Sequence, residues 1–218
     1  MNSQNSCEIE LSKLHPLRNV SQEGYGASGN FYSEKNGRVV NYESYGEFFL
    51  YQLLEQSALI SSYVEQPFSI PYALGQISAN YYPDVLTEFK DGRLVCIETK
   101  DPRRLADACT LAKAGAATRF LLEKNIVYCL VTSRLSSLKD IINEGHSALD
   151  DALLPIIDSV GFVGWSDVRN ITSEGPLSRN AIASFILRNR LFHSKAPFRI
   201  RRCSEGETCQ LFGSDLFN

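Results

Sequence analysis

The dipeptide Asp91-Gly92 constrains the fold more than any other feature of the sequence. It lies between two runs with the composition of β-strands, at about 81–89 and 93–100. Aspartate followed by glycine between such runs is a strong signal for a tight antiparallel hairpin. The sequence therefore predicts that these two runs pair, and the length of their loop decides which side chains lie opposite each other.

Two loop lengths are compatible with this hairpin, and they give different registers. A two-residue loop would place Asp84 and Glu98 on opposite faces of the strand pair. A three-residue loop at 90–92 pairs Phe89 with Arg93 instead and needs a left-handed final residue, which is a glycine here. Asp84 then lies directly opposite Glu98, and we expect this register.

The two strands carry a set of residues suited to cutting phosphodiesters. Glu98 and Lys100 are two positions apart on one strand, so their side chains share a face. Mg²⁺ prefers one or two carboxylates together with water and substrate phosphate. We expect Asp84 and Glu98 to bind it, with the backbone carbonyl of Ile97 as an extra ligand. Lys100 would orient or deprotonate the attacking water, or neutralise the phosphate.

A fourth candidate, Glu47, lies on a helix expected at 44–60. There it would share a second metal ion with the hairpin site. The segment Ser44-Tyr-Gly-Glu47 also matches a capping box, in which the glutamate only bonds back to the start of the helix. Both interpretations stay open.

The other elements complete a mixed α/β pattern around the hairpin. Pro67 and Pro71 interrupt a strand at 63–74 and make it an edge. A helix at 102–124 begins with Asp101 as its cap and Pro102 as its first residue. An apolar strand at 126–132, buried on both faces, and a helix ending near 143 follow. We expect a mixed sheet flanked by helices.

The sequence predicts three regions. These are an N-terminal arm at 1–30, a nuclease domain at 31–145 and a small basic domain at 146–218. Helices at 148–158, 165–171 and 178–192, followed by a strand at 197–202, favour a mainly helical, winged-helix-like unit. We expect Phe162 and Trp165 to form its core.

The charge distribution points to a polyanionic partner for the last region. Residues 169–202 carry eight Lys and Arg side chains against one acid, whereas residues 1–168 are near −7. A solvated basic face without a partner is the alternative. We expect five arginines to contact DNA phosphates: Arg188, Arg190, Arg199, Arg201 and Arg202.

Neither a membrane span nor a secretory leader is expected. No apolar run approaches the roughly 20 residues of a span, and the N-terminal residues lack the apolar core of a signal peptide. These features favour a cytoplasmic protein.

Five ordered blocks together resemble the nuclease domain of TnsA, the endonuclease subunit of heteromeric transposases and a member of the PD-(D/E)xK superfamily. The blocks are Gly29–Glu47, Glu65–Tyr72, Tyr81–Asp84, Ile97–Lys100 and Tyr128–Thr132. The resemblance implies a restriction-endonuclease-like fold and a Mg²⁺-dependent endodeoxyribonuclease in which Mn²⁺ can substitute. By position, the resemblance makes Asp84 and Glu98 the ligands of one or two metal ions, Lys100 the catalytic lysine and Glu47 the helix acid.

The resemblance also implies a role and partners. TnsA-like enzymes cut the 5′ ends of a transposon, on the strand that is not transferred. They act with a TnsB-like DDE transposase and a TnsC-like AAA+ regulator. Two other functions remain open, namely a stand-alone nuclease for restriction, repair or junction resolution, and a non-catalytic DNA-binding adaptor with the same fold.

Overall fold

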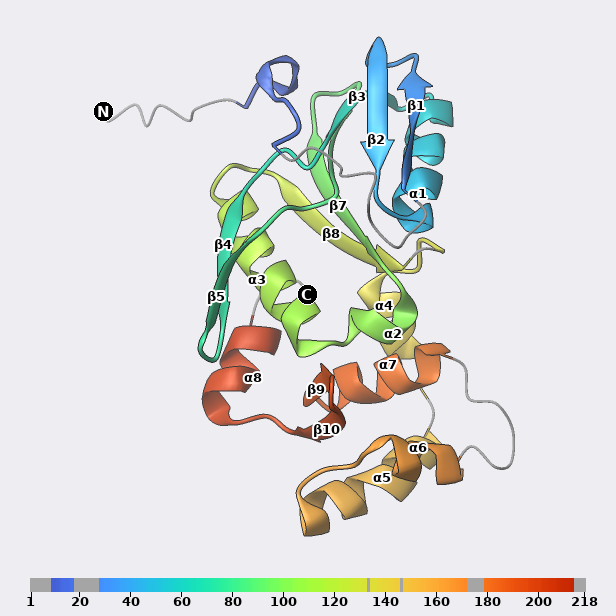
Figure 1. The fold of residues 1–218 in the computed structure, drawn as a ribbon, viewed down its shortest axis with the longest axis vertical. Coiled ribbons are helices and arrows are strands. Elements are labelled where there is room, and N and C mark those ends of the chain that lie inside the picture. The colour runs from blue at the N-terminus through green and yellow to red at the C-terminus, as the bar shows by residue number, and fades with distance from the viewer. Residues whose placement is uncertain (1–8, 18–27, 133, 146, 172–178, 214–218) are drawn as a thin grey trace.

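A four-stranded mixed sheet forms the centre of the molecule (Figure 1). The computed structural model describes residues 9–17, 28–132, 134–145, 147–171 and 179–213. The strand order is β3-β6-β7-β8; β7 pairs with β6 antiparallel and with β8 parallel. The strands are β3 (Ile60–Glu65), β6 (Val85–Phe89), β7 (Leu94–Lys100) and β8 (Val127–Thr132). The expected mixed sheet flanked by helices is confirmed.

The hairpin between β6 and β7 adopts the three-residue loop. The Phe89 N–H donates to the Arg93 carbonyl at 2.9 Å, and the Gly92 N–H donates to the Phe89 carbonyl at 2.9 Å. Gly92 has φ +84°, in the region that side chains disfavour. The ladder aligns Val85 with Ile97, so that the next position, Asp84, lies opposite Glu98. The expected register is confirmed.

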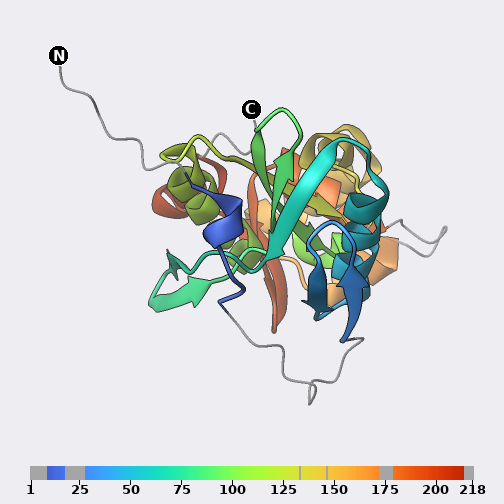
Figure 2. The same ribbon diagram turned by 90° about the horizontal axis from the view of Figure 1, so that it is seen from above.

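Helices α1 and α3 cover opposite faces of this sheet (Figures 1 and 2). Successive residues of β6 face opposite sides, as a strand requires. Val85 packs with the α1 residues Leu50 and Tyr51, whereas Leu86 packs with Ala117 of α3. The flanking elements are β1 (Gly29–Ser33), β2 (Arg38–Tyr42), α1 (Tyr45–Gln56), β4 (Ile70–Leu74), β5 (Ile77–Tyr81) and α3 (Ala108–Leu122).

Several boundaries differ from the prediction. The helix expected to reach residue 60 ends at Gln56, and Ile60 already belongs to β3. The helix expected at 102–124 is two helices, α2 (Pro102–Leu105) and α3, because Asp107 caps a second start. The cap by Asp101 is confirmed, since its side chain accepts from the Arg103 N–H at 2.9 Å.

The prediction that β8 is buried on both faces was wrong. β8 is the last strand of the sheet, with one neighbour, and Val127 is 59% exposed. Leu130 packs into the core on the α3 side. On the other side Val127, Cys129 and Val131 line an open groove. Continuous apolar composition therefore did not reveal that one face is only partly covered.

The C-terminal region combines helices with a β-hairpin, and its winged-helix-like character stays a prediction. Three helices precede a β-hairpin, and Val163 pairs with Ile200 of the second hairpin strand. The elements are α5 (Ser147–Val160), α6 (Trp165–Ile171), α7 (Arg179–Arg188), β9 (Leu191–Lys195), β10 (Phe198–Arg202) and α8 (Glu205–Phe212). The helix expected to reach residue 192 ends at Arg188, and β9 and α8 were not predicted.

Phe162 and Trp165 do not form the core of this region. They are 39% and 47% exposed, and Phe185, Leu191 and Ile200 are buried instead. Trp165 packs edge to face on Phe198, with ring centroids 5.1 Å apart. The two aromatic residues were expected in the core from their size, but Phe185 and buried aliphatic residues fill the interior instead.

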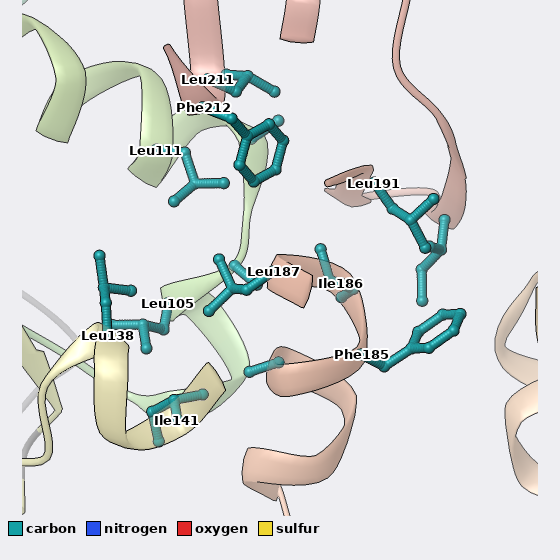
Figure 3. Close-up of a cluster of buried hydrophobic side chains, with 14 of the residues drawn as sticks. Leu105, Leu111, Leu138, Ile141, Phe185, Ile186, Leu187, Leu191, Leu211 and Phe212 are labelled. Carbon is teal, nitrogen blue, oxygen red and sulfur yellow. The ribbon is translucent and has the colours of Figure 1, made fainter. Parts of the chain in front are cut away.

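One hydrophobic cluster joins the two sides of residue 145 (Figure 3). Helix α7 packs on α2 and on α4 (Leu138–Asn143), and α8 packs on α3. The labelled side chains are Leu105, Leu111, Leu138, Ile141, Phe185, Ile186, Leu187, Leu191, Leu211 and Phe212. The three-part domain division stays a prediction, and any division at 145 cuts through this cluster.

No helix in the described ranges has the length and apolar content that a bilayer crossing demands.

We expect Leu187→Ala to destabilise the whole chain by about 2–5 kcal/mol, because a buried leucine in a shared core leaves a cavity. The matched control Leu122→Ala removes a side chain that is 61% exposed and should change stability by less than about 0.5 kcal/mol. Urea unfolding followed by circular dichroism measures both. Equal effects in the two variants would contradict a shared core.

Candidate active site

Asp84, Glu98 and Lys100 meet at the end of β7. The Asp84 N–H donates to Oε2 of Glu98 at 3.0 Å. Asp84 Oδ2 accepts from the Thr99 N–H at 2.8 Å and from the Thr99 hydroxyl at 3.1 Å. The Lys100 ammonium forms an ion pair with Glu98. The structure therefore brings together three of the predicted residues, while their catalytic roles remain predictions.

The two carboxylates are held out of water. Asp84 is 8% exposed and Glu98 is 2% exposed. Burial and the neighbouring charge of Glu98 raise the pKa of Asp84 to about 8, against the opposing effects of Lys100 and Thr99. Burial disfavours the Lys100 ammonium, but the charges of Asp84 and Glu98 outweigh it and raise the lysine pKa. The cluster has a deficit of positive charge that a divalent cation would offset.

The donor set fits Mg²⁺. Within the described ranges, no group of three or more His, Cys, Asp or Glu side chains is arranged to hold a metal by itself. Mg²⁺ does not require such a group, because it keeps several waters and binds through one or two carboxylates plus phosphate. Asp84 and Glu98 provide those carboxylates side by side.

Glu47 both caps α1 and belongs to the charge cluster. The Glu47 N–H donates to the Ser44 hydroxyl oxygen at 3.1 Å, and Glu47 Oε2 accepts from the Glu43 N–H at 2.8 Å. Burial and the charge of Asp84 raise the pKa of Glu47 to about 7. The charge of Glu47 also raises the pKa of Lys100. The bond back to the start of the helix is therefore present, while a share of Glu47 in a second metal ion stays a prediction.

The strand geometry favours the Thr99 carbonyl over that of Ile97 as a backbone metal ligand. In an antiparallel ladder every second pair of opposite residues is joined by backbone hydrogen bonds, and the Phe89–Arg93 pair is one of these. The Val85–Ile97 pair lies an even number of positions away, so the Ile97 carbonyl points to β6 and belongs to the ladder. The Thr99 N–H points to Asp84 beyond the end of β6, and the carbonyl of a strand residue points to the same side as its N–H.

Three tyrosine hydroxyls form hydrogen bonds around the carboxylate pair, and none of the three was predicted from the sequence as part of the site. The Tyr81 hydroxyl donates to Glu98 Oε2 at 2.6 Å and lies 3.1 Å from the Tyr128 hydroxyl. The Tyr51 hydroxyl donates to the Asp84 carbonyl at 3.1 Å. Tyr81 precedes Asp84 by three residues, but Tyr51 and Tyr128 are far away in sequence, and nothing local marks them.

The five predicted DNA-contacting arginines do not form one free basic face. Arg188 pairs with Asp150 (2.7 Å), Arg201 with Glu207 (2.7 Å) and Arg202 with Asp158 (2.9 Å). Within the described ranges, Arg190 and Arg199 have no ion pair. Neighbouring strand residues point to opposite faces, so that the last two arginines of β10 cannot contact one surface together.

Removing the Tyr81 hydroxyl should destabilise the fold. We expect Tyr81→Phe to cost about 1.5–3 kcal/mol at pH 7, because a buried carboxylate loses a donor. Tyr32→Phe is the matched control, since Tyr32 is 57% exposed, and it should cost under about 0.5 kcal/mol. Urea unfolding gives both values, and an unchanged Tyr81→Phe midpoint would contradict the network.

The buried charge of Asp84 predicts a pH-dependent stability. The raised pKa means that folded Asp84 keeps a proton that the unfolded chain releases, so that the contribution of Asp84 to stability falls between about pH 4 and about pH 8. Asparagine does not titrate, and we expect Asp84→Asn to raise the melting temperature in EDTA at pH 8 but to have little effect at pH 4.

The control for this experiment is Asp151→Asn, which changes an exposed aspartate and should leave the melting temperature unchanged at both pH values. A melting temperature at pH 8 that is lower for Asp84→Asn than for the wild type would contradict the buried-charge interpretation.

Comparison with known families agrees with the resemblance. Residues 57–133 match the family described as TnsA-like endonuclease N terminal. This range contains Asp84, Glu98 and Lys100, and Glu47 precedes it. A search of curated proteins found no match. Across residues 57–133, the chain is therefore similar to the TnsA-like endonuclease N-terminal family.

Proposed function

We propose that this protein is a Mg²⁺-dependent DNA endonuclease that acts as a subunit of a heteromeric transposase in the cytoplasm. The observation that carries the proposal is the buried pair Asp84–Glu98 with Lys100 beside it, inside the segment that matches an endonuclease family. Phosphodiester hydrolysis develops negative charge, and this site combines carboxylates for a cation with an ammonium.

Each side chain has a separate role in the proposal. Asp84 and Glu98 would hold Mg²⁺, with the Thr99 carbonyl on the same side, and the ion would stabilise charge on the phosphate. Lys100 keeps its proton at neutral pH because two carboxylates face it, so it orients water or neutralises a phosphate oxygen. Tyr81 fixes the position of Glu98. Glu47 joins the site from α1.

The finer assignment is cleavage of the 5′ ends of a transposon, on the non-transferred strand. A TnsB-like DDE transposase would cut and join the other strand, and a TnsC-like AAA+ regulator would control assembly. The support is the family match together with the five sequence blocks that resemble TnsA.

The catalytic proposal predicts that Asp84→Asn abolishes nicking. Losing a ligand of the metal removes several kcal/mol of transition-state stabilisation, at least about a hundredfold in rate. The assay is Mg²⁺- or Mn²⁺-dependent nicking of supercoiled plasmid. Asp91→Asn is the matched control, because Asp91 lies at the far end of the same hairpin and is exposed.

Metal binding gives a second readout that does not require partner proteins. Calorimetry should detect Mn²⁺ binding to the wild type and to Asp91→Asn, and none to Asp84→Asn. Nicking that persists in Asp84→Asn, or equal Mn²⁺ binding by both variants, would overturn the site assignment.

The transposase assignment predicts its genetic surroundings. We expect the coding sequences beside this one to include a DDE transposase and an AAA+ ATPase, because the three proteins act in one complex. Sequencing of the locus checks this. A locus with neither would favour the stand-alone nuclease.

A further inference from the structure

We propose that a hollow at the end of β7, the strand that carries Glu98 and Lys100, binds an unpaired nucleotide of the DNA substrate. The hollow has a volume of about 590 Å³. The lining residues that carry the argument are Arg103, Arg104, Trp165, His193, Lys195 and Phe198. The proposal deepens the nuclease function and rests on it, since that function brings DNA to Lys100.

The hollow begins where the catalytic strand ends. Lys100 is the last residue of β7, and Asp101, the next residue, already lines the hollow. Helix α2 follows at once and packs on α7, while the β9–β10 hairpin lies beside α7 (Figure 1). The hollow therefore lies between α2, which directly follows β7, and the C-terminal region.

Trp165 gives the hollow an aromatic surface. The indole is 47% exposed although it packs edge to face on Phe198, at 71° between the ring planes. A half-exposed tryptophan leaves apolar area in water, and such a surface suits a flat partner. Stacking on an aromatic side chain is the usual way in which proteins hold unpaired bases.

Two cations at the hollow have no acidic partner in the described part of the chain. Arg104 and Lys195 are exposed, and neither forms an ion pair with a described residue. Arg103, by contrast, is paired with Asp101 at 2.8 Å. Positive charge that the fold does not neutralise, next to an aromatic ring, matches the phosphate and the base of one nucleotide.

His193 adds an unsatisfied polar group to the lining. It is 4% exposed, and its ring nitrogens make no hydrogen bond of normal geometry. Burial lowers its pKa, against the opposing effects of Asp107 and of the Ala106 carbonyl, which lies close by. A neutral imidazole can both donate and accept, as the edge of a nucleobase requires.

An unpaired nucleotide fits these features better than two alternatives. An acidic peptide would satisfy Arg104 and Lys195, but its side chains offer no flat ring for Trp165. A base inside a duplex is stacked between its neighbours and cannot reach the indole.

The test uses the fluorescence of Trp165, which is the only tryptophan in the chain. The full-length Asp84→Asn protein is titrated in EDTA with a dT oligonucleotide of about eight nucleotides. We expect the oligonucleotide to quench the fluorescence. The double variant Arg104→Ala/Lys195→Ala should weaken binding at least tenfold. The slope of log K against log salt concentration should become shallower by about 1.4, because two phosphate contacts are lost.

The matched control is Arg119→Ala/Lys90→Ala, which removes the same two residue types from exposed positions away from the hollow. It should leave quenching, affinity and salt slope unchanged. Trp165→Ala, measured by anisotropy of a labelled oligonucleotide, should bind at least about fivefold more weakly. Thermal melts verify that every variant is folded.

Absence of quenching by dT in the folded protein would overturn the proposal. So would unchanged affinity in Arg104→Ala/Lys195→Ala, or stronger quenching by an oligoglutamate peptide or by a blunt duplex than by dT. These outcomes are separate from the nuclease function. A wild type that nicks plasmid, but whose Trp165 fluorescence dT does not quench, refutes the nucleotide site alone. A wild type that shows quenching but neither nicks plasmid nor binds Mn²⁺ refutes the active-site assignment alone.

Discussion

Two carboxylates held side by side out of water are the constraint on which this structure depends. The three-residue turn fixes the register that sets Asp84 opposite Glu98, and Gly92 makes that turn possible. Buried like charges destabilise a fold unless protons or cations offset them, and here Lys100 offsets only part. The hairpin therefore holds a site that favours a cation, which is the property that phosphodiester cleavage needs.

The rest of the fold supports this hairpin from both sides. Helix α1 covers one face and brings Glu47 to the cluster, while α3 covers the other. Tyr81 links Glu98 to Tyr128 on β8, so that three strands hold one carboxylate. The C-terminal region shares a hydrophobic cluster with α2, α3 and α4. A rigid frame of this kind positions ligands better than loops do.

Local signals predicted the centre of the molecule well. The turn register, the Asp101 cap and the meeting of Asp84, Glu98 and Lys100 depend on residues near each other in sequence, and all were confirmed. Features set by distant contacts were missed. The partners of Tyr81 lie on other strands, the arginines of β10 find acids on α5 and α8, and Trp165 remains at the surface because other residues fill the core. Charge counting cannot distinguish a paired arginine from a free one.

A crystal soaked in Mn²⁺ tests the central claim most directly, because anomalous scattering locates the ion without reference to activity. The account predicts an anomalous peak coordinated by both Asp84 and Glu98, within about 2.0–2.4 Å of a carboxylate oxygen of each. The result that would contradict this claim is Mn²⁺ bound at full occupancy at another place in the protein, with no ion within that distance of Asp84 or Glu98.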